Sequence, residues 1–271
     1  MIPRAGALLG VLTAQGGGGG FQAPNEKIFQ FAPVFTVAGF GVTKPMLMAV
    51  FGALVVLGGL WAAFGNPKVV PTKFQALAEQ GYLFVRDEIA RGVIGEKGDR
   101  YMPLLVSLFF FVWCLNIFAF IPLLQFPVTG RIAYPASIAM IVWVTYMFIG
   151  MRNQGPIGFF RNMAFPSGVP KGLYVLLAPI ELLSNIIVRP FTLAVRLFAN
   201  MFAGHLLVVM FSVAAWYFLV EDFGVLAFVG VGGLVMTIVM SLFELLIQFL
   251  QAFIITLLTA VYISSSLEAE H

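Results

Sequence analysis

The chain has 271 residues, of which 61% are hydrophobic and only 10% are charged. A soluble domain is typically about 25% charged, so the composition excludes a soluble globular protein and predicts an integral membrane protein. With one cysteine and two histidines, the chain has neither an internal disulfide nor enough ligands for a cysteine or multi-histidine metal site. The net charge is only +3, so the positions of the charges are more informative than their sum.

Residues 1–40 are expected to form a leader or a flexible periplasmic segment, ahead of a membrane domain at residues 41–271. The opening letters MIPRAGALLGVLTAQ combine one basic residue with a short apolar core, which is the pattern of a weak cleavable leader. The five glycines at 16–20 are typical of a flexible linker. A cleaved leader and a disordered tail both remain open, and neither carries chemistry.

Apolar windows of at least about 18 residues predict membrane-spanning helices. Three such windows lie near residues 46–65, 103–125 and 133–151. Between the first two, residues 72–94 carry apolar side chains at helical spacing among charged ones, which is typical of an amphipathic helix on the membrane surface. Its apolar residues are Phe74, Leu77, Phe84, Val85 and Ile89.

Two further apolar regions, 173–218 and 225–263, are unusually long. A helix of roughly 45 residues is about 68 Å long, twice the thickness of the hydrocarbon layer. Each region therefore holds either a tight hairpin or one strongly tilted helix. No cluster of turn residues interrupts 173–218, although Pro190 can kink it. We favour two long tilted helices, which gives an all-α membrane protein with about five membrane-embedded helices and one amphipathic surface helix.

The distribution of basic residues predicts the orientation, because Lys and Arg concentrate in cytoplasmic loops. The loops at 126–135 and 219–224 have one arginine and no base, respectively. The loops at 66–101 and 152–172 are rich in bases and are expected in the cytoplasm. With five embedded segments, the N-terminus then lies outside and the C-terminus in the cytoplasm. The bases are Lys68, Lys73, Arg86, Arg91, Lys97, Arg100, Arg152, Arg161 and Lys171.

The first long region carries a polar stripe despite its apolar composition. A charged side chain at the bilayer centre costs about 2.5–3.5 kcal/mol even on the lenient insertion scale. At about 100° per residue, five polar side chains fall within roughly 40° of one direction, with Glu181 at the edge. The stripe indicates an aqueous cleft or a polar partner, and the alternative is a static polar seam between helices. The five are Asn185, Arg189, Thr192, Arg196 and Asn200.

The last helix has a polar stripe of its own, so water can penetrate part-way between the two. Thr237, Glu244, Gln248, Gln251 and Tyr262 align within roughly 40°. His205 points roughly opposite to Arg196 on the preceding helix. Because imidazole titrates near neutral pH, His205 and Glu244 are candidates for a proton relay. The alternative is a buried histidine–glutamate hydrogen bond that only ties the helices together.

The segments LAVRLFANMFAGH and LLIQFLQAFIITLLTAVYI, with PIELLSN before them, are similar to subunit a of the F-type ATP synthase, the stationary part of its membrane motor. The resemblance covers the chain from about residue 40 and is strongest over 179–263. It implies that Arg196 faces the rotating ring of c subunits and keeps each passing carboxylate ionised. Because a guanidinium cannot release its proton, it would separate two offset proton half-channels.

The resemblance also implies roles for other residues and for neighbouring subunits. Asn200, His205, Glu244, Gln248 and Gln251 would serve the outer half-channel or the rotor face, with Gln251 near Arg196. Glu181 and Ser184 would lie near the inner half-channel. The expected partners are the c ring, the peripheral-stalk b subunits, membrane lipid and protons.

The sequence departs from the common family pattern at three places. Many relatives carry an acid at the position of His205 and a histidine at that of Glu244, so this chain keeps the pair but exchanges its members. Ala199 replaces a frequent glycine. The spacing between Glu181 and Arg196 is one residue longer than in common relatives.

Alternative functions belong to different classes. A secondary transporter would use Arg196 as a substrate counter-ion, but such proteins usually contain internal repeats, and none is detectable. A structural subunit without conduction is the third hypothesis. With no nucleotide motif, the chain is expected to be non-catalytic and to bind neither ATP nor nucleic acid, cofactor or metal. A bacterial plasma membrane is favoured over a mitochondrial or plastid one.

Overall fold

The computed structural model describes residues 35–37, 40–121, 127–165, 174–221, 224 and 226–267. The predicted leader and the glycine run therefore lie outside the described residues, and so does Lys171. The first described residues form a small antiparallel hairpin, β1 (Phe35–Val37) and β2 (Phe40–Val42), in which Phe35 pairs with Val42.

The remaining described structure is helical, which confirms the predicted all-α membrane fold. Five helices are long and apolar enough to cross a membrane. Many large apolar side chains on α2 (Lys44–Phe64) and α10 (Ala227–Leu267) are exposed, such as Leu54 and Leu246. Extended apolar surface of this kind is suited to lipid rather than to water. The five helices are Lys44–Phe64, Lys73–Ile117, Ala133–Gln154, Leu176–Val220 and Ala227–Leu267.

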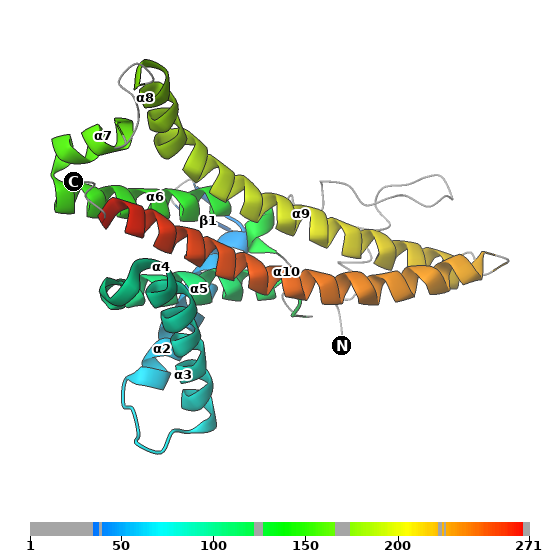
Figure 1. Cartoon of the computed structure of the whole chain (residues 1–271). Coiled ribbons are helices and arrows are strands. Elements are labelled where there is room, and N and C mark those ends of the chain that lie inside the picture. Colours follow the sequence, from blue (N-terminus) through cyan, green and yellow to red (C-terminus); the bar gives the residue numbers. More distant parts are fainter. Residues whose placement is uncertain are drawn as a thin grey trace.

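The helix α2 (Lys44–Phe64) begins with Pro45 in its first turn, where the missing N–H is not needed. The chain then returns through α3 (Lys73–Phe84), whose N-cap Thr72 accepts a hydrogen bond from the Gln75 N–H at 3.3 Å. Figure 1 shows α2 and α3 together as an antiparallel pair that projects from the body of the molecule.

The segment predicted as a separate surface helix is followed directly by the next span, and Gly95, with a φ of +79°, bends the chain between them. After α3 come the π-turn η2 (Val85–Arg91), the single turn α4 (Gly92–Ile94), η3 (Gly95–Tyr101) and α5 (Met102–Ile117). The predicted apolar stripe is divided. Phe74 and Leu77 are exposed, whereas Val85 and Ile89 are completely buried in the core.

After α5, the short turn η4 (Val128–Gly130) leads into α6 (Ala133–Gln154). A further helix, α7 (Pro156–Ala164), follows at Gly155, whose φ of +74° reverses the chain in a conformation that favours glycine. This helix lies within residues 152–172, for which the sequence predicts only a loop. The Gln154 amide donates to the Ser266 carbonyl at 2.9 Å, so the end of α6 is fixed to the end of the last helix.

Both long apolar regions are continuous helices, and neither contains a hairpin. The first comprises α8 (Tyr174–Leu183), η6 (Ser184–Val188), α9 (Arg189–Trp216) and η7 (Tyr217–Glu221), and the second is α10 (Ala227–Leu267). In Figure 1 α9 and α10 lie side by side as a long arm, and α2 and α3 run across its direction. At 41 residues, α10 is about 62 Å long, so it fits a bilayer of about 30 Å only when strongly tilted.

The core lies where α5 and α6 pack against α9 and α10. Phe109 and Leu115 of α5 are almost completely buried with Ala252 and Ile255 of α10. The turn η4 is buried in the same core and contacts α2, α5, α6 and α9. This packing fixes one side of α9 against the body of the molecule and leaves its other side open.

Candidate functional site

Arg196 lies on the open side of α9. Its neighbours Leu193, Ala194 and Leu197 are buried, at most 7% exposed, and they fix that helix against the core. Arg196 itself is exposed. Among the described residues, no side chain forms a hydrogen bond or an ion pair with its guanidinium. The arrangement presents a permanent positive charge at the surface of an apolar helix.

One helical turn further along α9, Asn200 connects this surface to α10. The Asn200 amide Nδ2 donates to Gln251 Oε1 at 2.8 Å, and Gln251 is only 3% exposed. Gln251 was expected near Arg196, and its hydrogen bond in the structure is with Asn200. The bond joins the two long helices at the level where both polar stripes meet.

His205 and Glu244 face each other between α9 and α10. Their Nδ1 and Oε1 atoms are 3.8 Å apart, and Glu244 is buried. This distance permits an ion pair but is too long for a direct hydrogen bond. A Cβ at Gly204 would lie 3.6 Å from the Glu244 side chain, which is an ordinary van der Waals contact, so the approach of the two helices does not require glycine there.

A small cavity with a volume of about 10 Å³ lies beside this pair. Within the described residues, four buried polar atoms here lack a hydrogen-bond partner: Glu244 Oε1, Gln251 Nε2, and both Nε2 and Oε1 of Gln248. An unpaired buried polar group costs about 1–3 kcal/mol, so these atoms favour a polar guest such as water. The lining is Asn116, Leu197, Asn200, Met201, Glu244, Ile247, Gln248 and Gln251.

A larger cavity of about 250 Å³ lies at the other end of α9. Tyr146 of α6 donates to the Asn185 carbonyl at 2.6 Å, and Asn185 Nδ2 donates to the Glu181 carbonyl at 2.8 Å. The Arg189 guanidinium lies 4.9 Å from the centre of the Tyr262 ring. Ser184 does not line this cavity. Its lining is Tyr146, Gln154, Phe159, Asn162, Met163, Glu181, Asn185, Arg189, Ser265 and Ser266.

The predicted single stripe on the first long helix is thus divided between two places. Asn185 and Arg189 belong to the larger cavity, whereas Arg196 and Asn200 lie on the exposed surface beside α10. The two groups are separated along the helix axis, because Arg189 and Arg196 lie in the same regular helix, seven residues and about 10 Å apart. Thr192 is exposed, and its hydroxyl donates to the Val188 carbonyl of its own helix at 2.8 Å.

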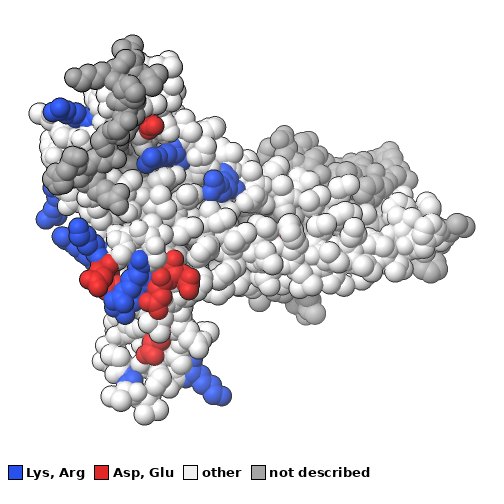
Figure 2. All heavy atoms as spheres, viewed as in Figure 1, with Lys and Arg blue, Asp and Glu red and all other residues white. Residues whose placement is uncertain are grey.

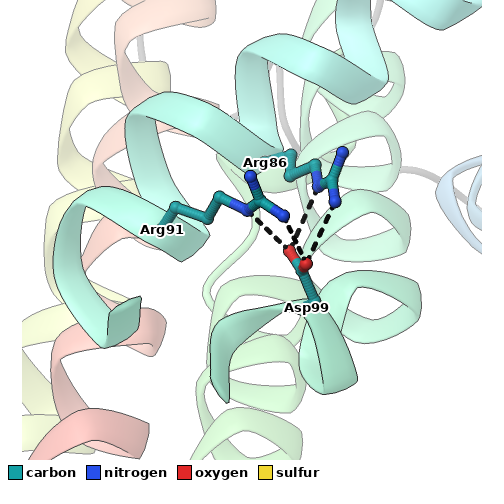
Figure 3. Close-up of polar contacts among 3 residues, drawn as sticks. All are labelled: Arg86, Arg91 and Asp99. Atoms are coloured by element: carbon teal, nitrogen blue, oxygen red, sulfur yellow. Dashed lines mark hydrogen bonds and ion pairs between the residues drawn. The ribbon is translucent and has the colours of Figure 1, made fainter. Parts of the chain in front are cut away.

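Sequence analysis did not single out a charge cluster at the start of the second span. Asp99 accepts paired hydrogen bonds from Arg86 and Arg91, with the shortest nitrogen–oxygen distance at 2.7 Å (Figure 3). The three side chains are between 31% and 44% exposed. The cluster ties η2 to η3, and its exposure limits its contribution to stability. No spacing rule in the sequence brings these residues together.

In the described part of the chain, no group of three or more His, Cys, Asp or Glu side chains is placed to hold a metal ion.

Comparison with known proteins gives a consistent family. Residues 46–264 match the family model described as ATP synthase A chain. The chain is 48% identical to ATP synthase subunit a of Streptomyces lividans, over 94% of this chain and 90% of that protein. It is 46% identical to the subunit of the same name from Frankia alni, over 93% and 88% of the two chains. With four-fifths of its residues covered by the family model, the chain belongs to the ATP synthase A chain family.

Proposed function

We propose that this chain is the stationary proton-conducting element of a bacterial rotary ATP synthase, within the complex that its family builds. It would face a ring of c subunits and contact the b subunits of a peripheral stalk. The observation that carries the proposal is Arg196, an exposed arginine on an apolar helix without a partner among the described residues. An unpaired charge on an apolar helix is costly in a membrane, so we expect an oppositely charged group on a neighbouring molecule to pair with Arg196.

Arg196 would act as an electrostatic barrier. A carboxylate carried past it on the ring is kept ionised, because a nearby positive charge favours the charged form. The guanidinium holds its own proton at any working pH. A proton therefore cannot pass Arg196 directly and must travel with the ring, which couples proton flow to rotation.

The outer half-channel would use the polar residues between α9 and α10. The buried Glu244 lies 3.8 Å from His205 and lines the small cavity with Gln248, Gln251 and Asn200. An imidazole and a carboxylate in contact with water are suited to accept and release protons. The Asn200–Gln251 hydrogen bond would hold the end of this path next to the ring.

The inner half-channel would use the larger cavity around Glu181, with Ser184 on the adjacent turn. This cavity is lined by residues at and before Arg189, and the small one by Leu197 and residues after it on the same helix. Arg196 lies between these two groups along the chain. Two separate cavities on either side of a fixed positive charge support two offset half-channels.

The orientation proposed for the membrane is N-terminus outside and C-terminus in the cytoplasm. The two base-rich regions meet at one end of the molecule, because Ser264 of α10 donates to the Val93 carbonyl at 3.4 Å and Gln154 donates to Ser266. In Figure 2 Lys and Arg gather at this end and on the α2–α3 pair, and none lies on the visible described surface of the outer half of the arm. This distribution supports a cytoplasmic location for that end.

The test is Arg196→Ala in bacterial membranes that contain the whole complex. We expect ATP-driven proton pumping and ATP synthesis to fall by at least about 100-fold, while the chain still assembles, since removal of one preorganised charge can have effects of this size. Arg196→Lys should also fail, because desolvation can neutralise an amine but not a guanidinium.

The control is Arg152→Ala, which removes an exposed arginine at the end of α6 and should leave pumping unchanged. Coupled pumping at the normal rate in Arg196→Ala would refute the proposal. Loss of assembly in both Arg196 variants would instead favour a purely structural subunit. The transporter alternative gains no support from the relatives, all of which are named as ATP synthase subunits.

A further inference from the structure

Asn116 of α5 is the one residue of the small cavity that comes from outside the two long helices. It is only 1% exposed. A buried amide must satisfy its donors and its acceptor, or it destabilises the core. Its place in the cavity wall raises the question of what its side chain binds there.

A second buried residue holds the Asn116 side chain. Thr129 lies in the turn η4, is completely buried, and donates its hydroxyl proton to Asn116 Oδ1 at 2.7 Å. Because the amide oxygen is engaged by Thr129, the amide nitrogen Nδ2 is the group left to serve the cavity. No acceptor for it exists among the residues that the structure describes.

Other side chains that line the cavity could bind a water molecule together with Asn116 Nδ2. Gln248 is 1% exposed, and neither its Nε2 nor its Oε1 has a hydrogen-bond partner among the described residues. Glu244 lines the same cavity, and its Oε1 also has no hydrogen-bond partner among the described residues. A buried water needs two to four polar partners and roughly 10–15 Å³, and the cavity of about 10 Å³ provides for one.

We propose that Asn116, oriented by Thr129, is a positioning residue that holds a water molecule against Glu244 and Gln248. The inference rests on the proposed function, since it places this water in the outer half-channel. The amide cannot relay a proton at neutral pH, so its part is to fix the water by donating from Nδ2. The water then passes one proton to the Glu244 carboxylate as it receives one from the entry side.

Two substitutions of Asn116 separate this role from simple packing. Asn116→Leu keeps the size of the side chain and removes its polar atoms, whereas Asn116→Ser leaves a hole but keeps a donor and room for a second water. If Asn116 only fills space, the leucine is tolerated and the serine is harmful. If it positions water, the order is reversed.

The experiment measures ATP-driven proton pumping in membrane vesicles that contain the whole complex, normalised to the amount of assembled chain. We expect Asn116→Leu to slow pumping about tenfold and Thr129→Val about two- to fivefold, the factors expected for the loss of one or two hydrogen bonds. Asn116→Ser and Thr129→Ser should stay within about twofold of the unaltered chain, because both keep a hydroxyl that can donate.

Thr256→Val is the matched control for Thr129→Val. Thr256 is also completely buried, but its hydroxyl bonds the Ala252 carbonyl of its own helix, away from the cavity lining. This variant should pump normally. If Asn116→Leu does not assemble, the comparison of Thr129→Val with Thr129→Ser decides the question.

The result that overturns the inference is normal pumping in Asn116→Leu and in Thr129→Val, or a more severe defect in Asn116→Ser than in Asn116→Leu. Arg196→Ala, measured in the same vesicles, keeps the two proposals distinct. If it still pumps normally, the proposed function fails. If it is inactive while Asn116→Leu and Thr129→Val are both normal, only the role of Asn116 is refuted.

Discussion

At the scale of single residues, the polar side chains of α10 at the site are buried, whereas two polar side chains of α9 are exposed. Glu244, Gln248 and Gln251 are turned into the protein and share a small cavity. Arg196 and Asn200, on the facing helix, lie at the surface. A proton path from water to a neighbouring subunit needs buried polar groups along its length and exposed polar groups only at its end, because the proton must reach the surface only where that subunit can accept it.

The His205–Glu244 pair gives a prediction at this scale. His205→Glu would bring two carboxylates to the 3.8 Å contact and should reduce proton pumping by about tenfold or more, since a relay needs groups of different proton affinity. The double variant His205→Glu with Glu244→His restores one acid and one imidazole and should recover most of the rate. Pumping in vesicles measures both, and a double variant no faster than the single one would contradict the prediction.

At the scale of the helical element, the π-turn η6 lies directly before α9, the helix that carries Arg196. The resemblance implies one more residue between Glu181 and Arg196 than in common relatives, and η6 (Ser184–Val188) lies between them. A π-turn takes up an additional residue while the helix continues. It also leaves a backbone carbonyl open to other donors, and Tyr146 binds that of Asn185. The extra residue is thereby accommodated without breaking the helix.

The packing of α7 on α6 gives a prediction at the same scale. A Cβ on Gly150 of α6 would overlap the ring of Phe159, which is 5% exposed. Gly150→Ala should therefore destabilise the chain by about 1–3 kcal/mol, the usual range for overpacking. Gly58→Ala in α2, where a Cβ meets nothing within 4 Å, is the control. The measurement is the temperature at which the detergent-solubilised complex loses this subunit, and an equal effect of both variants would disprove the close contact.

At the scale of the whole molecule, the two ends of the long helices differ in their charged residues. The end that joins α4, α6, α7 and the last turn of α10 carries basic residues, and no Lys or Arg lies on the visible described surface of the outer half of the arm (Figure 2). The arm crosses the direction of α2 and α3 (Figure 1). Such a shape presents a long side surface, rather than a pore through its centre, to a neighbouring molecule.

Cysteine labelling tests the orientation. With Cys114 replaced by serine, Gly224→Cys at the tip of the arm should react with a membrane-impermeant maleimide on intact cells. Lys97→Cys should react only in inverted vesicles, because base-rich loops remain in the cytoplasm. Both positions are exposed. The reverse pattern of labelling would show that the orientation is inverted.

Much of this protein could be predicted from residue order alone, because the relevant patterns are local. Apolar runs predicted the spanning helices, and the absence of turn residues in 173–218 favoured a continuous helix over a hairpin. The face count correctly grouped Glu244, Gln248 and Gln251, since α10 is a regular helix throughout. On the other long helix the same count placed Asn185 and Arg196 on one face, but a face count does not show that the two lie about 16 Å apart along the axis, with only Asn185 at the larger cavity.

The sequence by itself determined that this is a helical membrane protein with polar groups in its two longest helices, because hydrophobic length and periodicity act over neighbouring residues. Only the tertiary structure decided which polar groups meet. Asn116 and Thr129 come from a helix and a turn that packing brings against the site. Asp99 binds two arginines that no spacing rule connects to it. Contacts between distant segments depend on how whole helices pack, and packing is a property of the assembled core.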